Sequence, residues 1–217
     1  MFAVIFDFDG TILDSETAEF HSHRRFCADH GVELSEEEWS TGIGRVKPAT
    51  HWWDWLRARA EAPPAYEVFR ETTRRYFREH VCMEPMPGIT ALVGSLVAAG
   101  IPRAVASAAS SNWVFRALDE VQLASSFDAV VTGDQVAQPK PAPDVYVEAA
   151  RRLSIAPERC VAIEDSGPGL AAARAAGMRT VAIPHVLNRR HDFDGADLHL
   201  PSAVELTLER LRELVGK

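Results

Sequence analysis

Short runs of apolar and β-branched residues recur along the chain, and each run ends in a polar or glycine-rich turn. The runs lie at residues 2–6, 102–106, 129–132, 160–163 and 180–183. Helix-length segments separate them, which is the pattern of repeated strand–helix units. We therefore expect an α/β fold in which a Rossmann-like parallel sheet carries helices on both faces.

Glycine and proline indicate where the helices of this sheet begin and end. Residues 89–99 stop before a glycine, residues 144–153 follow a proline, and residues 170–176 again end before a glycine. Proline suits the first turn of a helix and glycine the position just after its last turn. The third segment is largely alanine, so a helix there can pack closely on the sheet.

The pattern changes between residues 15 and 84, where long amphipathic stretches carry many charges. Strand–helix alternation resumes only after this region. We therefore expect two domains: a discontinuous α/β core made of residues 1–14 and 85–217, and an inserted all-α cap at residues 15–84. The two crossings between them are the expected hinges.

Within the cap, local signals place two helix starts. Ser35 and Glu38 have the spacing of a capping box, and Pro48 suits the first turn of a helix that would carry Trp52 and Leu56 on one side. Aromatic residues at helical spacing belong more often to a hydrophobic core than to a binding surface. A stacking role on a sugar is the alternative for Trp52, Trp53 and Trp55.

The acidic composition excludes some classes of partner. The net charge is −8, with 31 acidic and 23 basic residues, so we expect neither nucleic acid nor a membrane surface as a partner. The three cysteines have no CxxC spacing, which argues against a disulfide framework or a structural zinc site and fits a reducing cytoplasm. We expect a soluble cytoplasmic monomer or small homo-oligomer that binds phosphate through a few local cations or a metal.

Asp7 and Asp9 follow the first apolar run directly. Ligands of open parallel sheets bind at the carboxyl ends of strands, and residues two apart on an extended chain point the same way. Two adjacent carboxylates repel, so one holds a proton or a cation neutralises them. This predicts one nucleophile and one acid/base.

The four letters Asp-Phe-Asp-Gly of residues 7–10 recur at residues 192–195, but no apolar strand precedes the second copy. This predicts a surface turn there.

Three further polar elements follow other predicted strands. Ser107 and Ala108 end the second run, where a hydroxyl and free N–H groups can bind phosphate oxygens. Lys140 lies among three prolines that restrict its backbone. Glu164 and Asp165 precede a glycine-rich loop, and hard oxygen ligands suit Mg²⁺. Each element alone also fits a helix cap or a solvated side chain, but all of them converge on one sheet edge.

The four motifs occur in a familiar order. They are Asp7-Phe8-Asp9-Gly10-Thr11, Ser107, Lys140-Pro141 and Glu164-Asp165-Ser166. This order resembles the pattern of haloacid dehalogenase-like hydrolases. The position of the insert resembles the branch with a small helical cap, which includes β-phosphoglucomutase and sugar-phosphate phosphatases.

The resemblance implies a Mg²⁺-dependent phosphatase that acts on a small phosphorylated metabolite, with sugar phosphates as the expected class. Asp7 would attack phosphorus to form a phosphoaspartate, and Asp9 would protonate the leaving group and then activate water, with Lys140 as the third catalytic residue. The implied phosphate-binding residues are Ser107, Ala108, Lys140 and Thr11; the implied Mg²⁺ ligands are Asp7, the Asp9 carbonyl, Asp165 and Glu164.

The cap departs from its relatives at one position. Mutases and hexose-phosphate phosphatases of this branch often carry a histidine where this chain has Glu19. In the mutase that histidine helps keep water from the phosphoenzyme, so Glu19 argues against mutase activity. Arg45 resembles an anion-binding position of the cap's substrate loop. Arg45 and Glu19 are the residues of the cap that we expect to bind the substrate.

Two alternatives stay open. One is a phosphosugar mutase of the β-phosphoglucomutase type. The other is a phosphoacceptor or binding scaffold on the same fold, because receiver domains also use an aspartate, a lysine and Mg²⁺ on a parallel sheet; such domains need neither a cap nor a second carboxylate like Asp9.

Overall fold

Six parallel strands form one sheet, in the order β3-β2-β1-β4-β5-β6. The computed structural model describes residues 1–43 and 50–216. The strands are β1 (Ala3–Phe6), β2 (Arg103–Ala106), β3 (Ala129–Val131), β4 (Cys160–Glu164), β5 (Arg179–Ala182) and β6 (Leu198–His199). The predicted parallel sheet is confirmed. The sequence pattern missed β6, because two residues are too few to show a periodicity.

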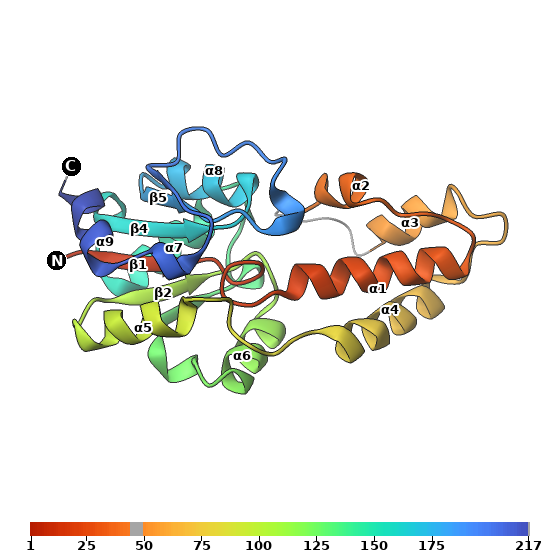
Figure 1. Ribbon diagram of the computed structural model, residues 1–217, viewed down its shortest axis with the longest axis horizontal. Coiled ribbons are helices and arrows are strands. Elements are labelled where there is room, and N and C mark those ends of the chain that lie inside the picture. Colours follow the sequence, from red (N-terminus) through yellow and green to blue (C-terminus); the bar gives the residue numbers. More distant parts are fainter. Residues whose placement is uncertain (44–49, 217) are drawn as a thin grey trace.

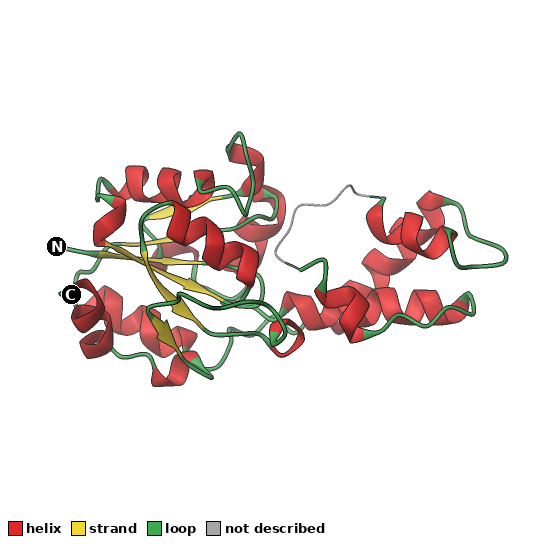
Figure 2. Cartoon of the chain, turned by 90° about the horizontal axis from the view of Figure 1, so that it is seen from above, coloured by secondary structure: helices red, strands yellow, loops and turns green. Residues whose placement is uncertain are grey.

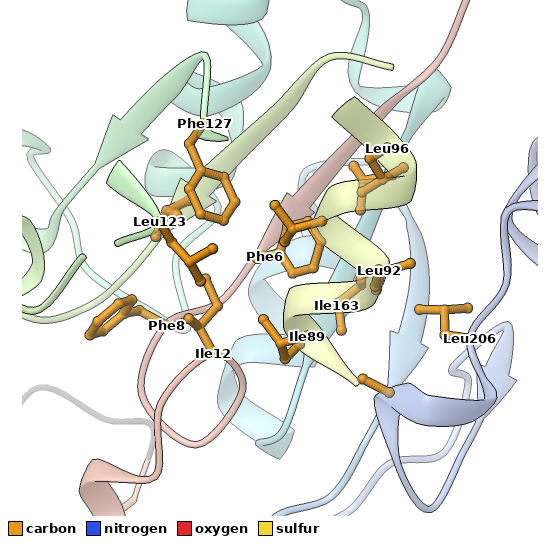
Figure 3. Packing of buried hydrophobic residues seen from close by; sticks show 14 of the residues in the cluster. Phe6, Phe8, Ile12, Ile89, Leu92, Leu96, Leu123, Phe127, Ile163 and Leu206 are labelled. Atoms are coloured by element: carbon orange, nitrogen blue, oxygen red, sulfur yellow. The ribbon is translucent and has the colours of Figure 1, made fainter. Parts of the chain in front are cut away.

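The central strand β1 packs against a helical layer on each face of the sheet. Val4 and Phe6 belong to one hydrophobic cluster, and Ala3 and Ile5 belong to another. This division follows from the pleat of a strand, which points successive side chains to opposite faces. All four side chains are fully buried. Figure 3 shows Phe6 packed among apolar side chains of the first cluster.

The helices of the sheet region cover both faces, as predicted. Those of the first cluster are α5 (Ile89–Ala98), α6 (Ser111–Glu120) and α9 (Leu208–Val215); those of the second are α7 (Asp144–Leu153) and α8 (Gly167–Ala175). Helix α8 begins three residues earlier than the sequence predicted. The reason is a cap: the Ser166 side chain accepts a hydrogen bond from the Gly169 N–H at 3.2 Å, and Pro168 lies in the first turn.

The remaining helices extend from one end of the sheet region, opposite the end where both termini lie (Figures 1 and 2). They are α1 (Ser15–Asp29), α2 (Glu36–Ser40), α3 (His51–Arg57) and α4 (Tyr66–His80). Helices α1 and α4 pack along each other, and the four helices share a hydrophobic cluster that includes Phe20 and Trp39. We call residues 15–84 the cap; this division stays a prediction.

The two predicted helix starts of the cap have different outcomes. The capping box of Ser35 and Glu38 is present, with both reciprocal hydrogen bonds formed. The third helix begins at His51, and Pro48 lies outside the described residues. Within residues 1–43 and 50–216, the helices lack the combination of length and apolar character that crossing a bilayer requires.

The cap tryptophans pack into the cap itself. Trp52 stacks on Trp39 with ring centroids 4.6 Å apart, and the Trp53 indole N–H donates a hydrogen bond to the Pro64 carbonyl at 2.9 Å. Trp55 meets Trp52 edge to face. These contacts favour the core role over sugar stacking.

We expect Trp52→Ala to destabilise the protein by about 3 kcal/mol, because it removes a large buried side chain and leaves a cavity. Urea unfolding measures this loss, and the KM for a sugar phosphate should stay unchanged. A higher KM without a loss of stability would instead indicate that Trp52 contacts the substrate.

Candidate active site

The chain beyond β1 brings two carboxylates to the carboxyl end of the sheet. The Asp7 N–H donates to the Ile163 carbonyl at 2.9 Å, so the chain stays in register with β4 one residue beyond the strand. Gly10 then turns the chain with a φ of +79°, a conformation that favours glycine. Asp7 and Asp9 both line a cavity of about 520 Å³.

This cavity lies between the end of the sheet and the cap. Its lining from the sheet region consists of Asp7, Asp9, Ala108, Ala109, Trp113, Lys140 and Ser166; its lining from the cap consists of Ser15, Glu16, Glu19, Ser22, His23, Thr73, Arg74 and Phe77. The cap side thus combines acidic, basic and hydroxyl groups with the rings of His23 and Phe77.

Lys140 is buried between two carboxylates. Its Nζ donates to Asp7 Oδ1 at 2.6 Å and to Glu164 Oε1 at 2.7 Å. The hydroxyl of Tyr146 also donates to Glu164 and lies 3.4 Å from the Lys140 Nζ. Burial alone would lower the pKa of Lys140, but the carboxylates of Asp7 and Glu164 outweigh it and raise that pKa. Lys140 therefore stays a cation at the bottom of the cavity.

Asp7, Glu164 and Asp165 form an acidic cluster in which one oxygen from each residue lies within 4.8 Å of the others. All three residues are buried. Burial, followed by the charge of Glu164, raises the pKa of Asp7 to about 7, although Lys140 opposes the shift. Burial, together with Asp7 and Glu164, also raises the pKa of Asp165. One lysine does not balance three carboxylates, so a divalent cation would stabilise the ionised cluster.

The backbone around the cluster leaves room only for glycine. A Cβ built on Gly10 would clash with the Asp165 carboxylate, and one on Gly169 would clash with the Glu164 carboxylate. Close backbone approach to carboxylates, with oxygen ligands from several elements, fits the donor set that Mg²⁺ prefers. The residues present therefore fit the ion that the sequence predicted.

Asn188 orients Asp165 from the loop after β5. It is fully buried, and its Nδ2 donates to Asp165 Oδ2 at 2.6 Å and to the Asp165 carbonyl at 3.3 Å. Its Oδ1 has no hydrogen-bond partner among the described residues. Hydrogen-bond partners of metal-binding side chains commonly fix the orientation of those side chains, and Asn188 would do so for Asp165.

Three donors hold the carboxylate of Asp9. Oδ1 accepts hydrogen bonds from the Ser15 hydroxyl at 2.5 Å and from the Trp113 indole N–H at 2.9 Å, and Oδ2 accepts one from the Ser107 hydroxyl at 3.4 Å. Burial raises the pKa of Asp9, and these hydrogen bonds partly offset that shift. Asp9 thus lies in the cavity beside Asp7 without a cationic partner of its own among the described residues.

Only some of the other predicted site residues lie at this cavity. Ser107 is fully buried against Asp9, while Ala108 lines the cavity. Thr11 lines a separate hollow, and its buried hydroxyl has no hydrogen-bond partner among the described residues. Glu19 lines the cavity from the cap. Arg45 lies outside the described residues.

Several residues of the site were not found from the sequence. Tyr146, Asn188 and Trp113 each hold a predicted site residue through one hydrogen bond or more. Tyr146 and Trp113 lie inside amphipathic helices, where their spacing resembles that of ordinary core residues. For Ser15 the sequence holds a weak indication of a role in the site, because it lies only eight residues after Asp7, just behind the first motif.

Comparison with known proteins identifies the family. Residues 4–183 match the family described as haloacid dehalogenase-like hydrolase. The chain belongs to this family. It is 31% identical to hexitol phosphatase B of Escherichia coli over 214 residues, which cover 96% of each chain. It is 31% identical to the phosphorylated carbohydrates phosphatase of Thermotoga maritima over 211 residues, which cover 95% of this chain and 94% of that protein.

A solved structure of a relative agrees with this result. The crystal structure of CbbY from Rhodobacter sphaeroides, in complex with xylulose-(1,5)bisphosphate, matches with a TM-score of 0.77 and 29% identity, over 97% of this chain and 99% of that one. The predicted family is therefore confirmed. The predicted enzyme class, a haloacid dehalogenase-like phosphoric monoester hydrolase, is confirmed as well.

Proposed function

We propose that this protein is a Mg²⁺-dependent phosphatase of a small sugar or polyol phosphate, which works through a phosphoaspartate on Asp7. The observation that carries the proposal is that Asp7, Asp9 and Lys140 line one cavity at the end of the sheet, with Asp165 in the acidic cluster beside Asp7. These residues come from three separate segments of the chain.

Asp7 is suited to the role of nucleophile. Its Oδ1 is held by Lys140 at 2.6 Å, which fixes the carboxylate in one orientation. Attack of an Asp7 oxygen on phosphorus forms the new O–P bond and breaks the ester O–P bond. Covalent catalysis of this kind divides one difficult displacement into two easier ones.

Asp9 is suited to proton transfer in both steps. It would give a proton to the departing ester oxygen and then take one from the water that attacks the phosphoaspartate. Asp9 lines the cavity and lies outside the acidic cluster, so its carboxylate can meet the leaving group of a substrate bound there. Residues of the cap line this side of the cavity, and closure of the cap over a substrate would limit the entry of bulk water.

Mg²⁺ would be held by Asp7, Asp165 and the Asp9 carbonyl, with Glu164 nearby. When bound, it neutralises charge on the transferring phosphoryl group. Lys140 contributes a second positive charge at the same place, and Ala108, which lines the cavity, is a proposed phosphate contact through its backbone N–H. Thr11, Ser107 and Arg45 stay proposed phosphate or anion contacts.

The cap side of the cavity supports a hydroxylated substrate. Glu16 and Glu19 carry acceptor oxygens and Arg74 carries donor N–H groups on this side, so a polyol chain can find partners for its hydroxyl groups. The relatives named for hexitols and phosphorylated carbohydrates agree with this class. A cytoplasmic location and a monomer or small homo-oligomer stay predictions.

A screen of sugar and polyol phosphates for released phosphate tests the proposal. We expect release with Mg²⁺, loss of release with EDTA, and recovery when Mg²⁺ is restored. Mg²⁺ should also raise the Tm, because it binds the folded acidic cluster and not the unfolded chain. Release that is insensitive to EDTA would contradict the proposal. Faster isomerisation of a sugar 1-phosphate than phosphate release would identify a mutase instead.

A further inference from the structure

Trp113 connects the proposed acid/base with the cap. It is the third residue of α6, and its indole N–H donates to Asp9 Oδ1 at 2.9 Å. The same ring meets Phe77 of α4 edge to face, with centroids 5.3 Å apart and planes at 73°. The ring of Phe8 contacts it in a similar geometry at 6.3 Å. The indole is thus held from the sheet region and from the cap together.

The hydrogen bonds leave the two oxygens of Asp9 in different situations. Oδ1 accepts from both Trp113 and Ser15, whereas Oδ2 faces only the longer contact with Ser107 among the described residues. An indole N–H is a donor only, so Trp113 has no proton to exchange in the reaction. Trp113 therefore helps to hold Oδ1, and Oδ2 is the oxygen with the weaker contact to the protein.

We propose that Trp113 is a positioning residue for Asp9, and that its contact with Phe77 links this placement to the docking of cap helix α4. This inference rests on the proposed function, since it assigns Asp9 the proton transfer. Trp113 would fix the orientation of Asp9 without itself taking part in the proton transfer. A movement of α4 away from the sheet region would break this ring contact and remove the support of the indole on that side.

Trp113→Phe tests the hydrogen bond, because phenylalanine keeps a ring in contact with Phe77 and removes the N–H. The probes are glucose 6-phosphate, whose alkoxide leaving group needs a proton, and 4-nitrophenyl phosphate, whose leaving group departs without one. We expect kcat/KM for glucose 6-phosphate to fall about tenfold, as for the loss of a hydrogen bond to a charged group, with little change for 4-nitrophenyl phosphate.

Trp53→Phe is the matched control. It removes an indole hydrogen bond of the same length, 2.9 Å, to the Pro64 carbonyl inside the cap. It should leave the ratio of the two kcat/KM values unchanged. Equal losses for both esters in Trp113→Phe, or no loss for either, would overturn the proposal, because a merely structural role does not distinguish leaving groups.

Phe77→Leu tests the link to the cap. In the wild-type background it should lower kcat/KM for glucose 6-phosphate more than for 4-nitrophenyl phosphate. In the Trp113→Phe background, Phe77→Leu should leave the ratio of the two kcat/KM values unchanged, because the indole N–H through which Phe77 acts is gone. A ratio that shifts equally in both backgrounds would overturn the link.

An NMR measurement keeps the proposal testable if Trp113→Phe fails to fold. The indole N–H signal of Trp113 should move in Asp9→Ala, while that of Trp53 stays in place; an unmoved Trp113 signal would overturn the proposal. If the wild-type protein releases no phosphate from any ester, the proposed function is wrong. That result is separate from the tests of Trp113, which compare variants with the wild-type protein.

Discussion

Asp7→Asn is expected to abolish Mg²⁺-dependent phosphate release, with a loss of at least roughly a thousandfold in kcat, while the protein stays folded. An amide oxygen is a poor nucleophile, so the phosphoaspartate cannot form. The amide still fits the same space and can accept the hydrogen bond from Lys140. Initial rates on the best substrate of the screen measure the loss, and far-UV circular dichroism measures the fold.

The chain supplies a matched control for this variant. Residues 192–195 repeat the letters Asp-Phe-Asp-Gly, and the structure places them in a loop in which Gly195 has a φ of +83° and Asp192 is exposed. Asp192→Asn should therefore keep full activity. Retained turnover in Asp7→Asn would remove the phosphoaspartate mechanism.

Lys140→Met is expected to destabilise the metal-free protein by about 3–5 kcal/mol, because it removes one partner of a buried ion pair and leaves the others uncompensated. The lysine is only 3% exposed, and its two carboxylate partners lie within 2.7 Å. Urea unfolding in EDTA measures the loss. Activity should fall in the same variant, because the phosphate loses a cation.

Arg190→Met is the control for this prediction. Arg190 pairs with Glu37 at 2.9 Å, but both side chains are largely exposed, so water screens the pair. Its loss should barely change the free energy of unfolding. A similarly small loss in Lys140→Met would show that the buried carboxylates are protonated or otherwise neutralised without the lysine.

The predicted positions of strands and helices succeeded where the local pattern was strong. Strand β1 is buried on both faces, so its apolar run is continuous and easy to recognise. Helix α7 has the predicted bounds, Asp144–Leu153, because Pro143 precedes its first turn and its apolar residues repeat at helical spacing. The late start predicted for α8 was wrong, because the side chain of Ser166 caps the helix and apolar periodicity carries no trace of such a bond.

The sequence pattern indicates the candidate site residues, but it does not indicate the contacts that hold them. Asp7, Lys140 and Asp165 were predicted because each follows a predicted strand or lies in the loop after one, and parallel strands end at one edge. Trp113 reaches Asp9 from 104 residues away, and Asn188 reaches Asp165 from 23 residues away across a loop. No periodicity or spacing connects such pairs.

The sequence alone thus determined the parallel sheet, the inserted helices, the family and the edge where the acidic residues gather. These properties follow from local patterns of apolar and polar residues and from motifs that are contiguous in the chain. Only the tertiary structure decided which groups touch: the lysine between two carboxylates, the asparagine behind Asp165 and the indole on Asp9. The physical reason is that a hydrogen bond depends on the distance and direction between two atoms, and for residues far apart in the chain these are set by packing.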